Sequence, residues 1–153
     1  MKNMERKMEK TTLSDYLEKN SSPLDVPSNN NLLMEVKHRL NQIGVINPER
    51  IYQGVKIIED GKGTGNIDLV VLAPDELYVI GIKIITKDQI EHRGKGHYTN
   101  RIDRQLDEAY EFFKRHFGEI PRMIGVYRLK GTTDFHHYER PRAIDDLLGV
   151  KQG

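Results

Sequence analysis

Two short apolar segments separated by a tight turn constrain the fold of this chain more than any other feature. Ile67–Leu72 is apolar on both faces apart from Asp68 at its start, and Leu77–Ile85 is apolar on both faces apart from Lys83. Strands with two apolar faces lie in the middle of a sheet that is covered on both sides. Because only the turn Ala73–Glu76 separates them, we expect the two segments to form a central hairpin.

Segments on either side of this hairpin have the spacing of helices and further strands. Apolar residues recur every three or four positions over Leu32–Ile43 and again over Arg101–Phe117, which predicts two amphipathic helices. Ile51–Ile58 and Pro121–Leu129 are expected to be strands. A strand–helix–strand connection normally pairs its two strands in parallel. The sequence therefore predicts an α/β fold with a mixed central β-sheet flanked by helices.

The first 30 residues differ in composition from the rest. Their charged start is followed by a stretch rich in Asn, Ser and Pro, which is typical of a linker. We therefore expect an arm and linker over residues 1–30 and one domain over residues 31–153. Within the arm, Thr12 followed by Asp15 is expected to begin a short helix that carries Leu13, Tyr16 and Leu17.

Bulk composition narrows the possible functions only a little. The 153 residues fit one domain, and the net charge of +1 means that nucleic-acid binding would need a local basic patch. The absence of cysteine excludes disulfides and zinc sites with thiolate ligands. No run of about 18 apolar residues and no secretory signal is present, so we expect a cytoplasmic protein without membrane partners.

The two polar residues of the central hairpin are expected to face each other. Residues two apart in a strand share a face, so Gly81 lies beside Lys83. A lysine in so apolar a strand is costly to bury without a partner, and the hairpin brings Asp68 within its reach. An ordinary internal ion pair between Asp68 and Lys83 is one interpretation. Glu35 on the first helix is equally able to pair with Arg39 one turn later.

Taken together, Glu35, Asp68 and Lys83 resemble the active-site motif of the PD-(D/E)XK nuclease superfamily, especially archaeal Holliday-junction resolvases and small archaeal-virus nucleases. In that family a helix carries a glutamate, a following strand an aspartate, and the next strand Glu-x-Lys. Here the Glu-x-Lys position reads Gly81-Ile82-Lys83. The resemblance covers residues 31–129. It implies a restriction-endonuclease-like fold, hydrolysis of DNA phosphodiesters, a homodimer and, if the protein is viral, a place in the host cytoplasm.

The resemblance also implies a role for each matching residue. Asp68 and the backbone carbonyl of Ile82 would bind Mg²⁺ or Mn²⁺, and Lys83 would serve the attacking water. Glu35 would support the hydration shell of the ion. Gly81 departs from the motif because glycine has no side chain to bind a metal.

Three interpretations of Gly81 stay open at this stage. The chain is an engineered or selected inactive variant of a nuclease, or a natural relative that binds DNA without cleaving it, or an enzyme in which another carboxylate replaces the missing one. Glu76 and Glu108 are the candidates for that replacement. The first two interpretations predict weak or absent cleavage. A non-catalytic DNA-binding protein on a nuclease fold is therefore the main alternative function.

Basic and polar residues after the second central strand form a candidate DNA-binding stretch. Glycines at positions 94 and 96 would let this loop approach a phosphate backbone, although a solvated surface loop explains the same composition. His136 and His137 are not expected to share a metal, because neighbours in a strand point to opposite faces. The candidate nucleic-acid contacts are Lys87, Arg93, Lys95, Arg101, Arg104 and Gln105.

Overall fold

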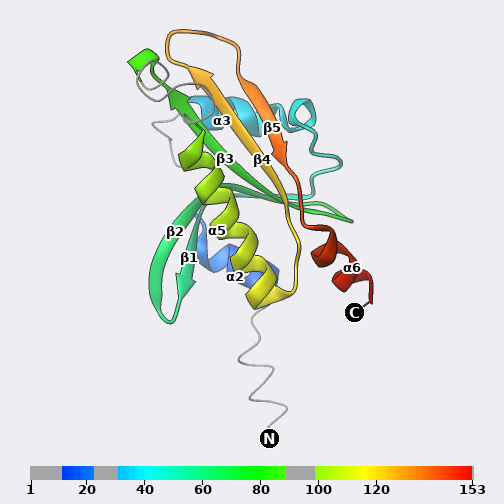
Figure 1. The fold of residues 1–153 in the computed structure, drawn as a ribbon. Coiled ribbons are helices and arrows are strands. Elements are labelled where there is room, and N and C mark those ends of the chain that lie inside the picture. The colour runs from blue at the N-terminus through cyan, green and yellow to red at the C-terminus, as the bar shows by residue number, and fades with distance from the viewer. Residues whose placement is uncertain (1–11, 23–30, 89–98, 153) are drawn as a thin grey trace, which may run out of the picture.

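A computed structural model describes residues 12–22, 31–88 and 99–152. It shows an α/β fold in which helices flank a five-stranded mixed sheet of order β1-β2-β3-β4-β5 (Figure 1). Only the β3–β4 pair is parallel. The fold class predicted from the sequence is confirmed. The elements are α2 (Leu13–Asn20), α3 (Asn31–His38), the 3₁₀ helix η1 (Leu40–Ile43), β1 (Arg50–Glu59), β2 (Lys62–Leu72), β3 (Leu77–Ile85), α5 (Asn100–Phe117), β4 (Arg122–Leu129), β5 (His136–Arg140) and α6 (Ile144–Gln152).

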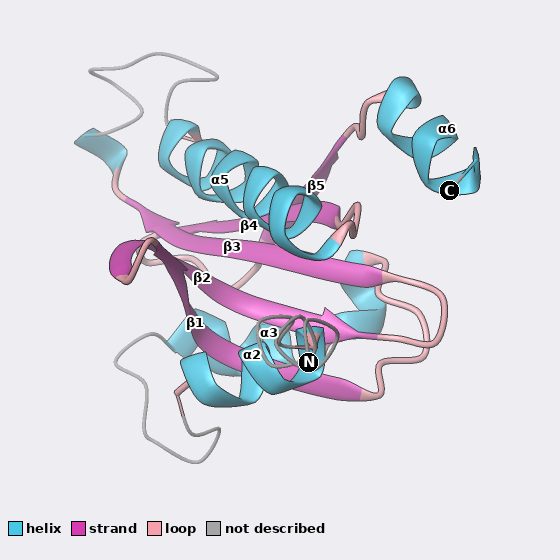
Figure 2. Ribbon diagram, turned by 90° about the horizontal axis from the view of Figure 1, so that it is seen from below, coloured by secondary structure: helices cyan, strands magenta, loops and turns pink. Residues whose placement is uncertain are grey.

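The two apolar segments form the centre of the sheet, as their composition predicts. β2 and β3 are antiparallel neighbours, with Leu72 opposite Leu77 and Leu69 opposite Ile80. The chain then crosses over through α5 and returns as β4, which pairs in parallel with β3 so that Gly81 lies opposite Gly125. Figure 2 shows α5 lying along β3 and β4.

Alternate residues of β3 pack into two separate cores, one on each face of the sheet. Leu77 and Val79 join the cluster beneath α5, and Tyr78 and Ile80 join the cluster that includes α3. This period of two is what burial on both faces requires of a central strand. As a result, Gly81 and Lys83 belong to the face covered by α5.

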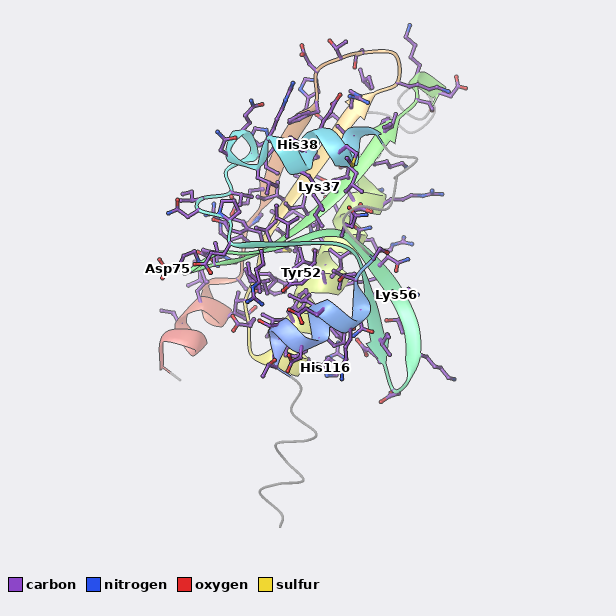
Figure 3. All side chains as sticks on the ribbon, turned by 180° about the vertical axis from the view of Figure 1, so that it is seen from behind. Lys37, His38, Tyr52, Lys56, Asp75 and His116 are labelled. Carbon is purple, nitrogen blue, oxygen red and sulfur yellow. The ribbon has the colours of Figure 1, made fainter. Side chains whose placement is uncertain are left out.

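Part of the expected arm packs onto the domain. The N-terminus of α2 is capped as predicted, since the Thr12 hydroxyl accepts a hydrogen bond from Asp15 N at 3.1 Å. Leu17 is fully buried, and the Tyr16 ring lies 5.2 Å from that of Phe112 on α5. The Tyr16 hydroxyl also donates to the carbonyl of Lys56, which Figure 3 labels on β1 beside α2.

Three elements differ from the sequence-based expectation. β2 begins at Lys62 rather than at Ile67, so Asp68 lies inside the strand and not at its start. The helix expected over Leu32–Ile43 ends at His38 as α3, and the 3₁₀ helix η1 follows it. Residues 136–140, to which the sequence pattern assigned no helix or strand, form the edge strand β5. None of the described helices is long and apolar enough to cross a membrane.

Candidate functional site

A pocket of about 260 Å³ lies between the sheet and the first turns of α5. β2 and β3 provide its floor, and α5 provides its wall. Five of its lining residues are ones that the sequence analysis singled out, and the sixth is the core residue Ile102. The lining residues are Asp68, Ile82, Lys83, Arg101, Ile102 and Gln105.

Asp68 is fixed in this pocket by the backbone of the neighbouring strand. Its Oδ2 accepts a hydrogen bond from Ile82 N at 2.7 Å, and its own backbone N lies 3.4 Å from Gln105 Oε1. Burial raises the pKa of the Asp68 carboxyl, and the hydrogen bonds from Ile82 and Gln105 partly oppose this rise. The fold therefore disfavours the charged form of this carboxyl relative to the unfolded chain.

The raised pKa of Asp68 predicts how stability depends on pH. Because the folded state binds this proton more tightly than the unfolded chain, the free energy of unfolding should fall as pH rises from the ordinary value of 3.8 through the folded-state pKa. Asp68→Asn keeps an acceptor for Ile82 N and removes the titration. Urea unfolding of the unsubstituted chain and of Asp68→Asn across this pH range should therefore show a smaller fall in the free energy of unfolding for Asp68→Asn. Equal falls would contradict a raised pKa at Asp68.

Gln105 occupies the space that a side chain at position 81 would need. A Cβ built on Gly81 would lie 3.0 Å from Gln105 Oε1 and 3.0 Å from Ile102 Cγ2. Both contacts are closer than ordinary van der Waals distance, so the wall of the pocket has closed over the glycine. Where the resemblance expects a carboxylate, the structure has a neutral amide from α5.

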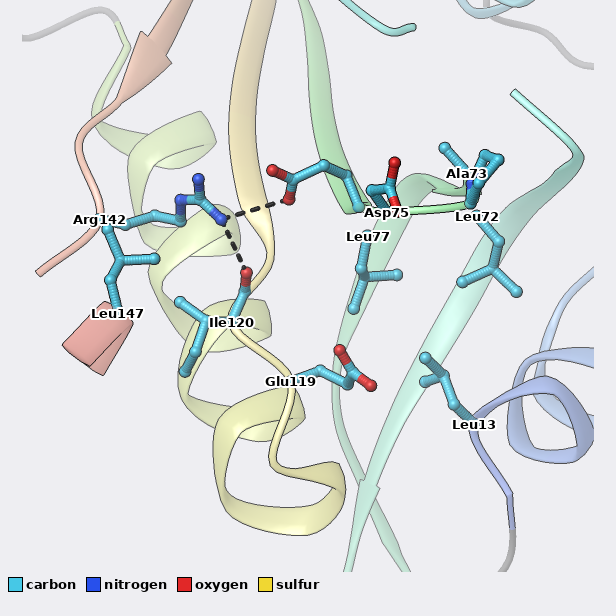
Figure 4. A pocket seen from close by; sticks show the side chains of 11 residues that line it. Leu13, Leu72, Ala73, Asp75, Leu77, Glu119, Ile120, Arg142 and Leu147 are labelled. Carbon is cyan, nitrogen blue, oxygen red and sulfur yellow. Dashed lines mark hydrogen bonds and ion pairs between the residues drawn. The ribbon is translucent and has the colours of Figure 1, made fainter. Parts of the chain in front are cut away.

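Neither candidate for a replacement carboxylate lines this pocket. Glu76 lies at the other end of β3, where Arg142 donates to its Oε2 at 3.3 Å and to the carbonyl of Ile120 at 3.2 Å. That region is a separate pocket of about 530 Å³, shown in Figure 4. Glu108 lies farther along α5, with its Oε2 2.8 Å from a Cβ built on Gly65.

Glu35 lies on the opposite face of the sheet from Asp68. Its helix, α3, packs into the second core cluster, and Glu35 Oε2 accepts a hydrogen bond from Arg128 Nη1 of β4 at 2.6 Å. Figure 3 shows α3 crossing the sheet on the side away from α2. The structure thus gives Glu35 a cationic partner other than Arg39, and the sheet separates it from the pocket.

The remaining candidate DNA contacts divide into two groups. Lys87 and Arg104 are exposed, Lys87 just beyond the end of β3 and Arg104 on the first turns of α5. Neither lines the pocket. Arg93 and Lys95 lie outside the described residues.

A contact that sequence reasoning missed holds the first turns of α5 in place. The hydroxyl of Tyr138 on β5 donates to Asp103 Oδ1 at 2.6 Å, and Arg140 Nη1 lies 3.5 Å from the same oxygen. Burial and the hydrogen bond to Asp103 raise the pKa of the Tyr138 hydroxyl, so it remains a donor. Arg101 and Gln105 project from this anchored part of the helix. The contact could not be predicted from the sequence, because the polar residues of β5 show no strand pattern.

The donor atoms of the pocket do not fit a divalent ion. Mg²⁺ requires oxygen ligands in nearly octahedral geometry, usually including carboxylates. Among the described residues that line the pocket, Asp68 is the only carboxylate, and Lys83 and Arg101 add positive charge. Within residues 12–22, 31–88 and 99–152, no three His, Cys, Asp or Glu side chains form a group that could hold a metal. We therefore assign no chemical step to a metal in this chain.

Neither a protein-family model nor a curated protein matches this chain. The chain has a partial structural similarity to a solved structure described as "Crystal structure of SSO0001", with 19% sequence identity and a TM-score of 0.40. The similarity covers 79% of this chain and 54% of that one, so the chain spans about half the length of that protein.

Proposed function

We propose that this chain binds DNA through phosphate contacts in the pocket beside Asp68 and hydrolyses phosphodiesters weakly or not at all. The observation that carries the proposal is the lining of the pocket, where Lys83, Arg101 and Gln105 surround the one carboxylate that the described lining residues contain. Phosphate oxygens accept hydrogen bonds from these three side-chain types, and those from lysine and arginine are strengthened by charge. Binding of this kind positions a backbone without reading its sequence.

The PD-(D/E)XK resemblance supports the same conclusion from the sequence. The resemblance matches Asp68 and Lys83 to that motif; the two residues lie on the neighbouring central strands β2 and β3, and a parallel crossover to β4 follows. The motif glutamate is missing at Gly81, and Gln105 lies in its space. A nuclease fold that keeps its phosphate contacts and lacks its second carboxylate would bind DNA and fail to cut it.

Removing a cation from the pocket should weaken DNA binding in a salt-dependent way. Lys83→Ala and Arg101→Ala should each lower the affinity for a labelled duplex and reduce the slope of log K against log salt by about one, because each removes one phosphate contact. Fluorescence anisotropy over a range of salt concentrations measures both quantities.

A control cation lies far from the pocket, at the tip of the β1–β2 hairpin. Lys62→Ala removes the same charge there and should leave the salt slope unchanged. Circular dichroism checks that Lys83→Ala stays folded, since Lys83 lies on a core strand. If both pocket variants behave like Lys62→Ala, DNA does not bind at this site.

A further inference from the structure

Three neighbouring strands place a lysine, a tyrosine and a histidine in one row beside the pocket. Lys83 of β3 lies opposite Tyr127 of β4, and Tyr127 lies opposite His136 of β5. The row belongs to the face covered by α5, because Tyr127 packs against the core cluster on that face. Adjacent strands are about 4.8 Å apart, so the backbone of His136 lies about 10 Å from that of Lys83.

The two rings of this row are stacked on each other at the edge of the sheet. The centroids of Tyr127 and His136 are 5.3 Å apart, with 29° between the ring planes, and Tyr138 lies 6.3 Å from Tyr127. His136 is exposed and Tyr127 is partly buried. β5 is the edge strand of the sheet that the described residues form, so no further strand in that part of the chain covers the outer side of His136.

We infer that Tyr127 and His136 form a stacking platform for one unpaired base whose phosphate lies at Lys83 and Arg101. This inference rests on the proposed function and adds the class of substrate. A base inside a duplex is already stacked on both sides, whereas an unpaired base offers a free face to an aromatic ring. The site therefore favours DNA with unpaired bases over continuous duplex.

The competing explanation is that the ring pair only stabilises the pairing of β4 with β5. The two explanations differ in what happens to ligands. A purely structural pair would affect all DNA equally through stability, whereas a stacking platform affects only DNA with unpaired bases.

The chain offers a matched control for this test. His137 is the next residue, is also exposed, and lies on the other face of β5, opposite Val126 of the second core cluster. The probes are a fluorescein-labelled oligothymidylate and a labelled blunt duplex of the same length, each titrated with the full chain and followed by anisotropy.

His136→Ala should weaken oligothymidylate binding about tenfold, because stacking on one aromatic ring typically contributes that much. Duplex binding should change less than about twofold. His136→Phe retains an aromatic ring without the imidazole nitrogens and should keep the affinity, and His137→Ala should leave both ligands unaffected. This pattern would support a stacking platform.

Other outcomes separate the inference from the proposed function. If the chain binds duplex through Lys83 and Arg101 and His136→Ala has no effect on oligothymidylate, the platform is wrong and the phosphate site stands. If His136→Ala weakens both ligands equally, the ring pair is structural and the platform is again overturned. If the chain binds neither probe at low salt, both proposals fail.

Discussion

The double variant Gly81→Glu/Gln105→Ala should gain a divalent-ion site and Mg²⁺-dependent cleavage of DNA. Gly81 lies on the same face as Asp68, one step beyond the paired residues Leu69 and Ile80. A glutamate there would add a second carboxylate oxygen donor beside Asp68, which is the kind of ligand that a hard cation prefers. Gly81→Glu alone should be destabilising by about 1–3 kcal/mol, because its Cβ would crowd Gln105 and Ile102.

Gln105→Ala removes one of the two 3.0 Å contacts, so the double variant Gly81→Glu/Gln105→Ala should fold better than Gly81→Glu. At Mn²⁺ concentrations about 100 times its dissociation constant, the ion should stabilise the double variant by about 2.7 kcal/mol, and thermal unfolding measures this gain. Cleavage of linear and branched duplex with Mg²⁺ or Mn²⁺ is the second measurement.

The matched control for this experiment is Gly81→Gln/Gln105→Ala, which has the same shape without the added charge. It should gain neither ion binding nor cleavage. A folded double variant with glutamate that gains no Mn²⁺ binding would show that the pocket is not a disarmed metal site. In that case only the cations Lys83 and Arg101 would support the DNA-binding proposal.

The sequence predicted the centre of this fold well because burial on both faces leaves a strong signal. The continuous apolar run of β3 has the bounds expected, and its hairpin and parallel partners follow from the length of the connections. Thr12 and Asp15 likewise indicated the start of the short helix in the arm, and the hydrogen bond from Asp15 N to the Thr12 hydroxyl caps α2 there. Local patterns therefore sufficed where apolar residues decide the structure.

The errors arose where polar residues form regular structure. Asp60 and Gly61 have φ angles of 52° and 77°, which makes them a two-residue hairpin turn that lengthens β2. An Asp-Gly pair between strands is a known signal for this turn and would have placed Asp68 inside the strand. β5 has no apolar alternation, because it is an exposed edge strand, so periodicity could not find it.

The residues of the candidate site likewise divide into those that the hydrophobic pattern places and those that it does not. Asp68, Lys83 and Gln105 come together because they lie on the central strands and the crossover helix, whose arrangement the hydrophobic pattern determines. Glu35 is separated from them because the face of the sheet on which a helix packs is a long-range property. Its partner Arg128 is distant in sequence, so no local pattern could indicate the pairing.

Gly125→Ala should be destabilising by about 2–4 kcal/mol, a large effect for one methyl group. A Cβ at this position would lie 2.3 Å from Tyr138 Cζ, so the Tyr138 ring lies directly over the glycine. The ring would have to move away, which exposes it and breaks its hydrogen bond to Asp103. Urea unfolding measures the change. Gly63→Ala is the control, because a Cβ there meets no atom within 4 Å.

A double-mutant cycle tests whether Tyr138 is the cause. In the Tyr138→Ala background the added methyl group should be nearly neutral, so the two substitutions should be strongly non-additive. Additive effects would instead mean that the backbone of β4 resists the methyl group for another reason. Because Tyr138 anchors the start of α5 through Asp103, a displaced ring would also release Arg101 and Gln105 from the pocket. Gly125→Ala should therefore weaken DNA binding even under conditions where the variant is fully folded.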